Sequence, residues 1–314
     1  MIELRNATKT YGSLVALDSL TLDIGEGEIF GFIGPNGAGK STTMKILACL
    51  TRPDSGTAKI NGLDVTLNGA QIRTLVGYMP DFLGVYDDLT VDEYLQFFAS
   101  AFRIPRAKRR VIVDSVLELT DLSEKKYAMV DSLSRGMQQR LGVARVLIHE
   151  PRVLLLDEPA SGLDPRARIE MRELLTELGR MGKTIMISSH ILSELAEMCT
   201  CIGIIERGKL LYSGSIEDAY SKASAGERIV VTLEEGGATV QQVAAALGSS
   251  SASSMIASAA PENGLLVLDL HHGVKSHHEI IQALVGAGAR IAAFTPRQIK
   301  LEDAFLRLTK GALN

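Results

Sequence analysis

The stretch that decides the fold is GPNGAGKST, made up of Gly34, Pro35, Asn36, Gly37, Ala38, Gly39, Lys40, Ser41 and Thr42. It follows the apolar run 29–33, which is typical of a buried strand, and it precedes a segment with a helical pattern. In that context the glycines let successive backbone N–H groups surround a phosphate, and the positive end of the helix dipole faces the same anion. The nine residues therefore predict a loop that binds nucleotide phosphates.

Two motifs supply the chemistry that a nucleoside triphosphate needs. We expect Lys40 to reach the β- and γ-phosphates and Ser41 to offer its hydroxyl to Mg²⁺. The run 153–156 (VLLL) leads into Asp157 and Glu158, so that two carboxylates lie at the carboxyl end of a buried strand, where open α/β sheets bind ligands. We expect Asp157 to hold Mg²⁺ through water and Glu158 to polarise the water that attacks the phosphate.

Composition and charge exclude several classes of protein. The chain has 314 residues, which exceeds the usual size of one hydrophobic core and predicts a large domain with a smaller one. No stretch approaches the roughly 20 apolar residues that cross a bilayer, and the first residues do not resemble a secretory signal. A net charge of -4 argues against a broad nucleic-acid surface, so no nucleic-acid partner is expected. We therefore expect a protein of the cytoplasm.

The pattern along residues 1–222 predicts an α/β nucleotide-binding domain. Short β-rich runs surround the glycine loop up to about residue 60, which indicates an antiparallel β subdomain beside a phosphate-loop NTPase core. Thr90 and Glu93 form a capping-box pattern before an apolar stripe, so we predict an inserted helical subdomain at about 89–130. From 134 to 216 short apolar runs alternate with helical segments, which is typical of a parallel sheet covered on both faces.

A second, small α/β domain is expected at 227–314, after a linker of small and polar residues at 221–226. Its predicted order is strand (229–233), helix (240–247), a serine- and alanine-rich loop, strand (265–270), helix (280–284), strand (290–294) and a last helix from Leu301. This accessory domain carries no catalytic motif of its own.

The segment LSRGMQQR at 133–140 resembles the signature motif of ATP-binding cassette (ABC) proteins. This resemblance implies that two ATPase subunits face each other head to tail, and that the signature of one acts on the ATP held by the other. The residues concerned are Leu133, Ser134, Arg135, Gly136 and Met137. Independently of the family, Ser134 has the chemistry to cap the following helix and to present its hydroxyl to an anion.

Other elements of the same family follow in order, and the resemblance covers roughly residues 2–220. It implies that Tyr11 stacks on adenine, that Asp164 belongs to the loop coupling the two sites of the dimer, and that His190 contacts the γ-phosphate and holds the water-polarising group. The implied catalytic residues are thus Glu158, His190 and Lys40. The implied ligands are ATP and Mg²⁺.

Asp81 departs from the common family pattern, which has a glutamine contacting Mg²⁺ at this position. Aspartate keeps an acceptor oxygen, so we retain Asp81 with Ser41 and Asp157 as a metal ligand, but it is shorter and adds a negative charge. We therefore expect an ATPase that is slower or differently coupled to its transporter. An acidic residue here resembles the ATPases of two-component bacterial exporters of the drug-resistance and polysaccharide-export types, as does the closing segment 301–309.

The resemblance implies an ATP-hydrolysing subunit that powers an exporter through a separate multi-span permease. Its partners would be that permease and a second ATPase subunit, identical or related, and its location the cytoplasmic face of the inner membrane. One alternative is a soluble ABC ATPase acting on ribosomes or DNA, but the chain has neither two cassettes nor a long coiled coil. Another is a binding-only subunit with an inactive site, against which Glu158, Lys40, Ser134 and His190 argue.

Overall fold

The computed structural model describes residues 1–82, 84, 88–191, 195–218, 227–250, 252–271, 274 and 276–297. The chain divides into two compact units, Met1–Ser215 and Ile216–Asn314, and each is described by itself. No helix within the described ranges is both long enough and apolar enough to span a bilayer.

A six-stranded sheet forms the centre of the first unit, with strand order β10-β9-β3-β8-β7-β6. Neighbouring strands are parallel, except that β9 and β10 form an antiparallel hairpin. The strands are β3 (Ile29–Ile33), β6 (Val76–Met79), β7 (Val153–Asp157), β8 (Thr184–Ser189), β9 (Cys201–Glu206) and β10 (Lys209–Ser215). Every residue of β3, β7 and β8 is buried, as the continuous apolar runs predicted for a sheet covered on both faces.

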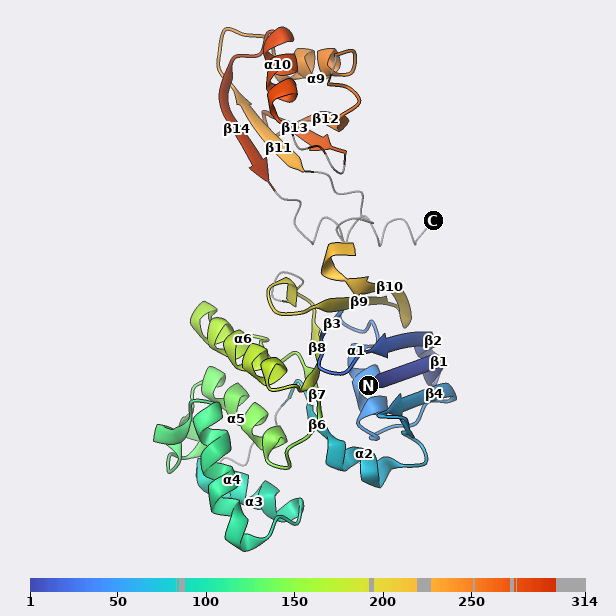
Figure 1. The fold of residues 1–314 in the computed structure, drawn as a ribbon, viewed down its shortest axis with the longest axis vertical. Helices are drawn as coiled ribbons and strands as arrows, with labels where there is room; N and C mark the ends of the chain where they lie inside the picture. The colour runs from blue at the N-terminus through green and yellow to red at the C-terminus, as the bar shows by residue number, and fades with distance from the viewer. Residues whose placement is uncertain are drawn as a thin grey trace. The chain divides into compact units, whose positions relative to one another are not determined.

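A second, antiparallel sheet with order β2-β1-β4-β5 lies on one side of this sheet (Figure 1). Its strands are β1 (Ile2–Tyr11), β2 (Leu14–Ile24), β4 (Ser55–Ile60) and β5 (Leu63–Asp64). Helix α1 (Lys40–Leu47) contacts both sheets, and α2 (Gly69–Leu75) precedes β6. Met44 and Leu47 of α1 join Phe30 of β3 and Leu22 of β2 in one buried cluster, where each side chain contributes roughly 1.5–3 kcal/mol by leaving water. This core fixes the phosphate loop between the two sheets.

The other face of the six-stranded sheet carries further helices of the first unit (Figure 1). They are α3 (Val91–Ala101), α4 (Arg106–Leu119), the short 3₁₀ helices η1 (Ser123–Lys125) and η2 (Val130–Ser132), α5 (Arg135–Leu147) and α6 (Pro165–Arg180). Helix α3 begins with the predicted capping box, because the Thr90 hydroxyl accepts from the Glu93 N–H at 3.3 Å and the Glu93 carboxylate accepts from the Thr90 N–H at 2.9 Å.

The second unit follows the order β11 (Arg228–Leu233), α9 (Val240–Leu247), β12 (Ile256–Glu262), β13 (Leu265–Leu270), α10 (His278–Gly286) and β14 (Ile291–Arg297). Its antiparallel sheet has order β12-β13-β11-β14, which is a ferredoxin-like βαββαβ arrangement. Val243 of α9 and Leu284 of α10 join Ile229 and Leu268 of the sheet in one cluster, so both helices pack on the same face.

The sequence was wrong about one element of this unit. The segment predicted as a serine- and alanine-rich loop contains strand β12, which pairs only with β13 at the edge of the sheet. Its small side chains are exposed or half-buried, so they lack the alternation of apolar residues by which a strand is recognised. Pro261 fits this place because an edge strand tolerates a residue without an N–H donor. The predicted linker at 221–226 and the helix from Leu301 lie outside the described residues.

Candidate functional site

The loop from Gly34 to Gly39 connects the end of β3 with the start of α1, and its glycines are required by their surroundings. Gly37 and Gly39 have φ angles of 80° and 113°, in the left-handed region that favours glycine. A Cβ on Gly39 would lie 2.6 Å from the Ala16 carbonyl oxygen, and one on Gly34 would lie 2.2 Å from that of Ile205. Gly34 and Gly39 are therefore packed so closely against the residues beneath the loop that a side chain would not fit at either position.

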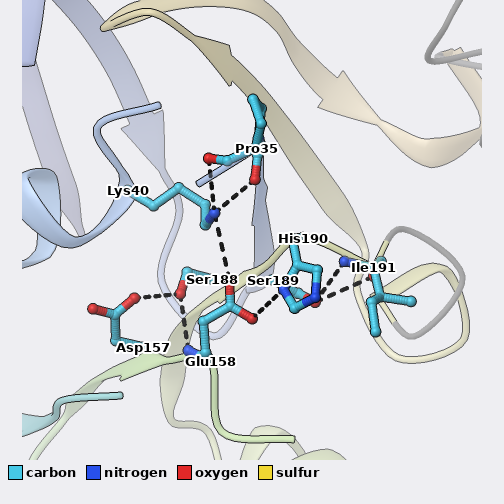
Figure 2. Close-up of polar contacts among 9 residues, drawn as sticks. Pro35, Lys40, Asp157, Glu158, Ser188, Ser189, His190 and Ile191 are labelled. Carbon is cyan, nitrogen blue, oxygen red and sulfur yellow. Dashed lines mark hydrogen bonds and ion pairs between the residues drawn. The ribbon is translucent and has the colours of Figure 1, made fainter. Parts of the chain in front are cut away.

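Lys40 is the first residue of α1, and only 6% of it is exposed. Its Nζ donates to the carbonyl oxygens of Gly34 at 2.6 Å and Pro35 at 3.3 Å, and it lies 3.4 Å from Oε1 of Glu158 (Figure 2). These acceptors hold the ammonium group across the phosphate loop. A buried cation at the mouth of an anion-binding loop is placed to neutralise phosphate charge.

Asp157 and Glu158 lie where β7 ends, and a serine on the neighbouring strand holds both. Ser188 is paired with Asp157 in the register of β7 and β8. Its hydroxyl donates to Oδ1 of Asp157 at 2.6 Å and accepts from the Glu158 N–H at 2.9 Å (Figure 2). Sequence reasoning gave Ser188 no role, although two apolar strands that both end in polar residues are the signal for such a contact.

The Glu158 carboxylate is held between a lysine and a histidine. Besides the contact with Lys40, its Oε2 lies 2.8 Å from Nδ1 of His190, which is in hydrogen-bonding range (Figure 2). The Glu158 side chain is 12% exposed and that of His190 is 45% exposed. The backbone of Glu158 has φ 53°, an unfavourable value for a residue with a side chain. The carboxylate is thus fixed toward the phosphate loop, as a group that polarises water requires.

A cavity of about 230 Å³ brings many of the predicted site residues together. Its walls are formed by Tyr11, Leu14, Ala16, Pro35, Asn36, Gly37, Ala38, Gly39, Lys40, Ser41, Thr42, Asp81 and Glu158. Tyr11 is 47% exposed, and the Nζ of Lys9 lies 5.6 Å from its ring centroid. An aromatic ring at one end and the phosphate loop at the other suit a molecule with a flat base and a phosphate chain.

Carboxylates converge on the wall of this cavity that holds Asp81. Burial, followed by the charges of Asp157 and Glu158, raises the pKa of Asp81, while Arg135 and His190 act in the opposite direction. Burial, followed by the charges of Asp157 and Asp81, raises the pKa of Tyr78 to about 12. A cation bound at this wall would offset the repulsion among these carboxylates.

The donor set here fits Mg²⁺. Asp157 is 2% exposed, and within the described ranges no cation of the protein pairs with it. Ser41, Asp81 and Asp157 offer only oxygen atoms, which are the ligands that Mg²⁺ prefers. The described residues contain no cluster of three or more acidic, histidine or cysteine side chains able to hold a metal alone. An ion at this place would therefore need further ligands, such as phosphate oxygens and water, which are usual for Mg²⁺ with a nucleotide.

The signature segment and Asp164 do not contribute to this cavity. Ser134 caps α5, where its Oγ accepts from the Met137 N–H at 3.4 Å, and Leu133 beside it is buried. Asp164 caps α6, where its Oδ1 accepts from the Ala167 N–H at 2.9 Å. The cap predicted at Ser134 is present, and Asp164 is a cap that the sequence analysis did not predict; neither side chain lines the cavity at the phosphate loop.

A phosphate loop after β3 of a parallel sheet, an Asp–Glu pair at the end of β7, which is separated from β3 by β8, and a histidine that contacts that glutamate define an ATP-binding cassette. The family model described as "ABC transporter" matches residues 17–161. Together with a relative that is 33% identical over 98% of this chain, this match shows that the chain belongs to the ABC transporter family. It is an ATP-binding and ATP-hydrolysing subunit of the exporter type, as the sequence predicted.

Three bacterial relatives are similar over two thirds of the chain or more. The Nod factor export ATP-binding protein I of Cupriavidus metallidurans is 33% identical over 309 residues, which are 98% of this chain and 97% of that protein. The same protein of Burkholderia orbicola is 40% identical over 214 residues, 68% of this chain and 70% of that protein. A probable multidrug ABC transporter ATP-binding protein, YbhF of Escherichia coli, is 36% identical over 75% of this chain and 40% of that protein.

Solved structures confirm the cassette fold of the first unit. A dimeric ATP-binding cassette in a post-hydrolysis state with ADP and Pi is 27% identical, with a TM-score of 0.63 over 69% of this chain and 99% of that chain. The cbiO1 protein of Clostridium perfringens, part of the ABC transporter complex cbiONQ, is also 27% identical, with a TM-score of 0.65 over 70% of this chain and 90% of that one. Thus the predicted α/β phosphate-loop fold is confirmed.

Proposed function

We propose that this chain pairs head to tail with a second ATPase subunit, identical or related, and drives export through a separate membrane-spanning permease. The observation that carries the pairing is the lining of the cavity. It includes Tyr11, the phosphate loop, Asp81 and Glu158, but none of the signature residues 133–137 and not Asp164. A second subunit would bring its own signature to the open side of this cavity.

In the proposed reaction each side chain has one task. Lys40 and the N–H groups of the phosphate loop hold and neutralise the β- and γ-phosphates. Glu158 accepts a hydrogen bond from the water whose oxygen attacks the γ-phosphorus, while the bond from phosphorus to the β–γ bridging oxygen breaks. His190 keeps Glu158 in this orientation through the 2.8 Å contact, and Ser188 fixes the backbone from which Glu158 projects.

Ser41, Asp81 and Asp157 would hold Mg²⁺ together with the phosphate oxygens. The bound ion neutralises charge that develops on the transferred phosphoryl group. Asp81 adds a negative charge that glutamine in its place would not have. The binding of the ion and the position of the loop that carries Asp81 would therefore depend on each other more strongly than with glutamine.

The two units of the chain would have different roles. We assign nucleotide chemistry to a cassette domain at 1–222, with its helical subdomain at about 89–130 facing the permease, and an accessory role to a domain at 227–314. The relatives are, by name, ATP-binding proteins of a Nod factor export system and of a multidrug ABC transporter, which supports an assignment at the cytoplasmic face of the membrane.

Recovery of the full chain from solubilised membranes tests the partnership. The tagged chain should bring down a multi-span subunit, and the recovered complex should hydrolyse ATP with Mg²⁺ present. The same complex carrying Glu158→Gln should be recovered in equal amount without hydrolysing ATP. Recovery with ribosomes or DNA, and with no multi-span subunit, would overturn the proposal.

A further inference from the structure

Helices α5 and α6 meet along a seam that begins at the first residues of both. A Cβ on Gly136, in the first turn of α5, would lie only 2.9 Å from the Cβ of Ala167 in the first turn of α6. One turn further, Nη2 of Arg140 on α5 lies 3.8 Å from Oε2 of Glu170 on α6. The signature segment that opens α5 is therefore packed against the helix that follows the loop 161–164.

Arg135 extends this seam onto the loop 161–164 itself. A Cβ on Gly162 would lie 2.4 Å from the central carbon of the Arg135 guanidinium and 2.5 and 2.6 Å from its two terminal nitrogens. All three distances are nearly equal, so the flat face of the guanidinium lies over Gly162. Gly162 has φ 67°, which favours glycine independently of this contact.

The contact of Arg135 with Gly162 is one of packing. Within the described part of the chain no hydrogen bond or ion pair holds the guanidinium. Its charge acts on Asp81 and opposes the raised pKa of that carboxyl, while its contact with Gly162 depends on the fit of its plane. A guanidinium is planar and weakly hydrated and packs on flat groups, whereas an ammonium group does not. The identity of residue 135 as arginine therefore matters beyond its charge.

The loop under Arg135 leads directly from the catalytic strand. The Ser161 N–H donates to the Glu158 carbonyl oxygen at 3.0 Å, and Leu163 is buried at 4% exposure. The Leu163 carbonyl oxygen accepts from Nε of Arg168 at 3.0 Å. Both ends of the loop are thus held by their own contacts. Gly162 between them is exposed to solvent, although the Arg135 guanidinium packs against one side of it.

We propose that Arg135 is a positioning residue that joins the signature segment and the loop 161–164 of one chain into a single unit, so that both reach the nucleotide of the partner subunit together. This inference rests on the proposed head-to-tail pairing. Arg135 acts through Gly162 of its own chain and not by touching ATP. Its loss should therefore slow hydrolysis while ATP binding by each subunit is kept.

A double-mutant cycle in the full chain tests the contact, with kcat and KM for ATP and Mg²⁺ as readouts. Arg135→Gly should lower kcat about tenfold with little change in KM, less than the roughly 100-fold that a 1 Å misplacement can cost. Gly162→Ala should lower kcat in the parent chain about fivefold more than in the Arg135→Gly chain, because only the parent has a guanidinium to displace. Equal factors in both backgrounds would overturn the proposal.

Gly182→Ala is the matched control for backbone strain. Gly182 has φ 82°, and no atom lies within 4 Å of the place of its Cβ. Its substitution should have the same small effect with or without Arg135. Arg135→Lys keeps the charge but not the flat group, so it should behave like Arg135→Gly; full activity of Arg135→Lys would contradict the packing contact.

A second measurement separates this role from contact with the partner's phosphate. In the Glu158→Gln background, ATP should drive dimers at the same concentration, within about twofold, whether residue 135 is arginine or glycine. A need for about tenfold more ATP without Arg135 would show direct contact with nucleotide and overturn the inference. If Glu158→Gln itself forms no ATP-dependent dimer, the proposed function fails, and the kcat cycle still decides whether Arg135 and Gly162 act together.

Discussion

The hydroxyl of Ser188 joins the carboxylate of Asp157 to the neighbouring strand with a hydrogen bond of 2.6 Å, and it accepts the Glu158 N–H from its other side. Ser188 is fully buried at 0% exposure, so water cannot replace its hydroxyl. One hydroxyl therefore fixes both the side chain of a proposed metal ligand and the backbone of the residue proposed to polarise water.

Replacing Ser188 by alanine should reduce ATP hydrolysis about tenfold, since hydrogen bonds to charged groups contribute about 1.5–3 kcal/mol. Titration with a fluorescent ATP analogue and a steady-state ATPase assay measure binding and turnover separately, and binding should change less. Ser189→Ala is the matched control, because the Ser189 hydroxyl bonds the backbone of Ile191 instead. Equal losses in both variants would mean that the effect is not specific to Asp157 and Glu158.

Lys40→Ala and Glu158→Gln should fail in different ways. The alanine removes the buried cation that faces the phosphates, so ATP affinity should fall. The glutamine keeps the shape of Glu158 but not its charge, so ATP should bind and hold the dimer closed while hydrolysis stops. Size-exclusion chromatography with ATP distinguishes the two results. Normal turnover by Glu158→Gln would show that another group activates the water.

Asp54 should stabilise the strand end that carries Tyr11 in a pH-dependent way. Its carboxylate accepts from Lys9 Nζ and the Thr10 N–H, both at 2.7 Å, and from the Thr10 hydroxyl at 2.8 Å. These bonds, that of Lys9 first, lower the pKa of Asp54 to about 2. The stabilisation is present above the ordinary value of 3.8 and is lost as the pH falls toward 2.

Asp54→Asn should therefore lower the urea unfolding midpoint at neutral pH, and the difference from the parent chain should narrow below about pH 4. Unfolding followed by circular dichroism at several pH values provides the measurement. A difference that stays constant down to about pH 3 would show that the charge of Asp54 is not its cause.

In the protein without nucleotide, the contribution of Asp81 to folding stability should depend on pH in the opposite direction to that of Asp54. Burial and the nearby carboxylates raise its pKa, so the folded chain binds this proton more tightly than the unfolded chain. The ionised group destabilises the fold at neutral pH, and the cost disappears as the pH falls through the raised pKa toward the ordinary value. Asp81→Asn should raise the urea unfolding midpoint above that of the parent chain at neutral pH. The difference between the two midpoints should shrink as the pH is lowered.

Asp131→Asn is a control for that result. Asp131 is exposed, and its side chain has no hydrogen bond or ion pair within the described residues. Its substitution should leave the midpoint nearly unchanged at all pH values. If Asp81→Asn is no more stabilising than Asp131→Asn, then repulsion from Asp157 and Glu158 does not destabilise the ionised Asp81 as proposed.

The nucleotide-binding half of the fold was predictable because its signals are local. The run 29–33, the glycine loop and helix α1 are consecutive, and each has a pattern that few other structures share. The same holds for the buried strand ending at Asp157 and for the capping box at Thr90. In these segments the residues that contact one another in the fold are also close together in the sequence, so the sequence alone is enough to predict them.

Three features of the fold and the site were not predictable, because they depend on contacts between residues far apart in the chain. Ser188 meets Asp157 only through the register of two strands that are separated by helix α6. Strand β12 is held by its pairing with β13, and its own residues carry little apolar pattern. The contact of Arg135 with Gly162 likewise requires α5 and α6 to be packed first. No single segment contains the information for any of the three.

The left-handed backbone of Glu158, with φ 53°, has a consequence for how this position changes over generations. Glycine or asparagine would adopt that conformation at lower cost than glutamate. Backbone strain alone therefore favours glycine or asparagine at this position, and the proposed role of the carboxylate in ATP hydrolysis is what would retain it. In a chain that had lost this chemistry, residue 158 would be among the first to drift.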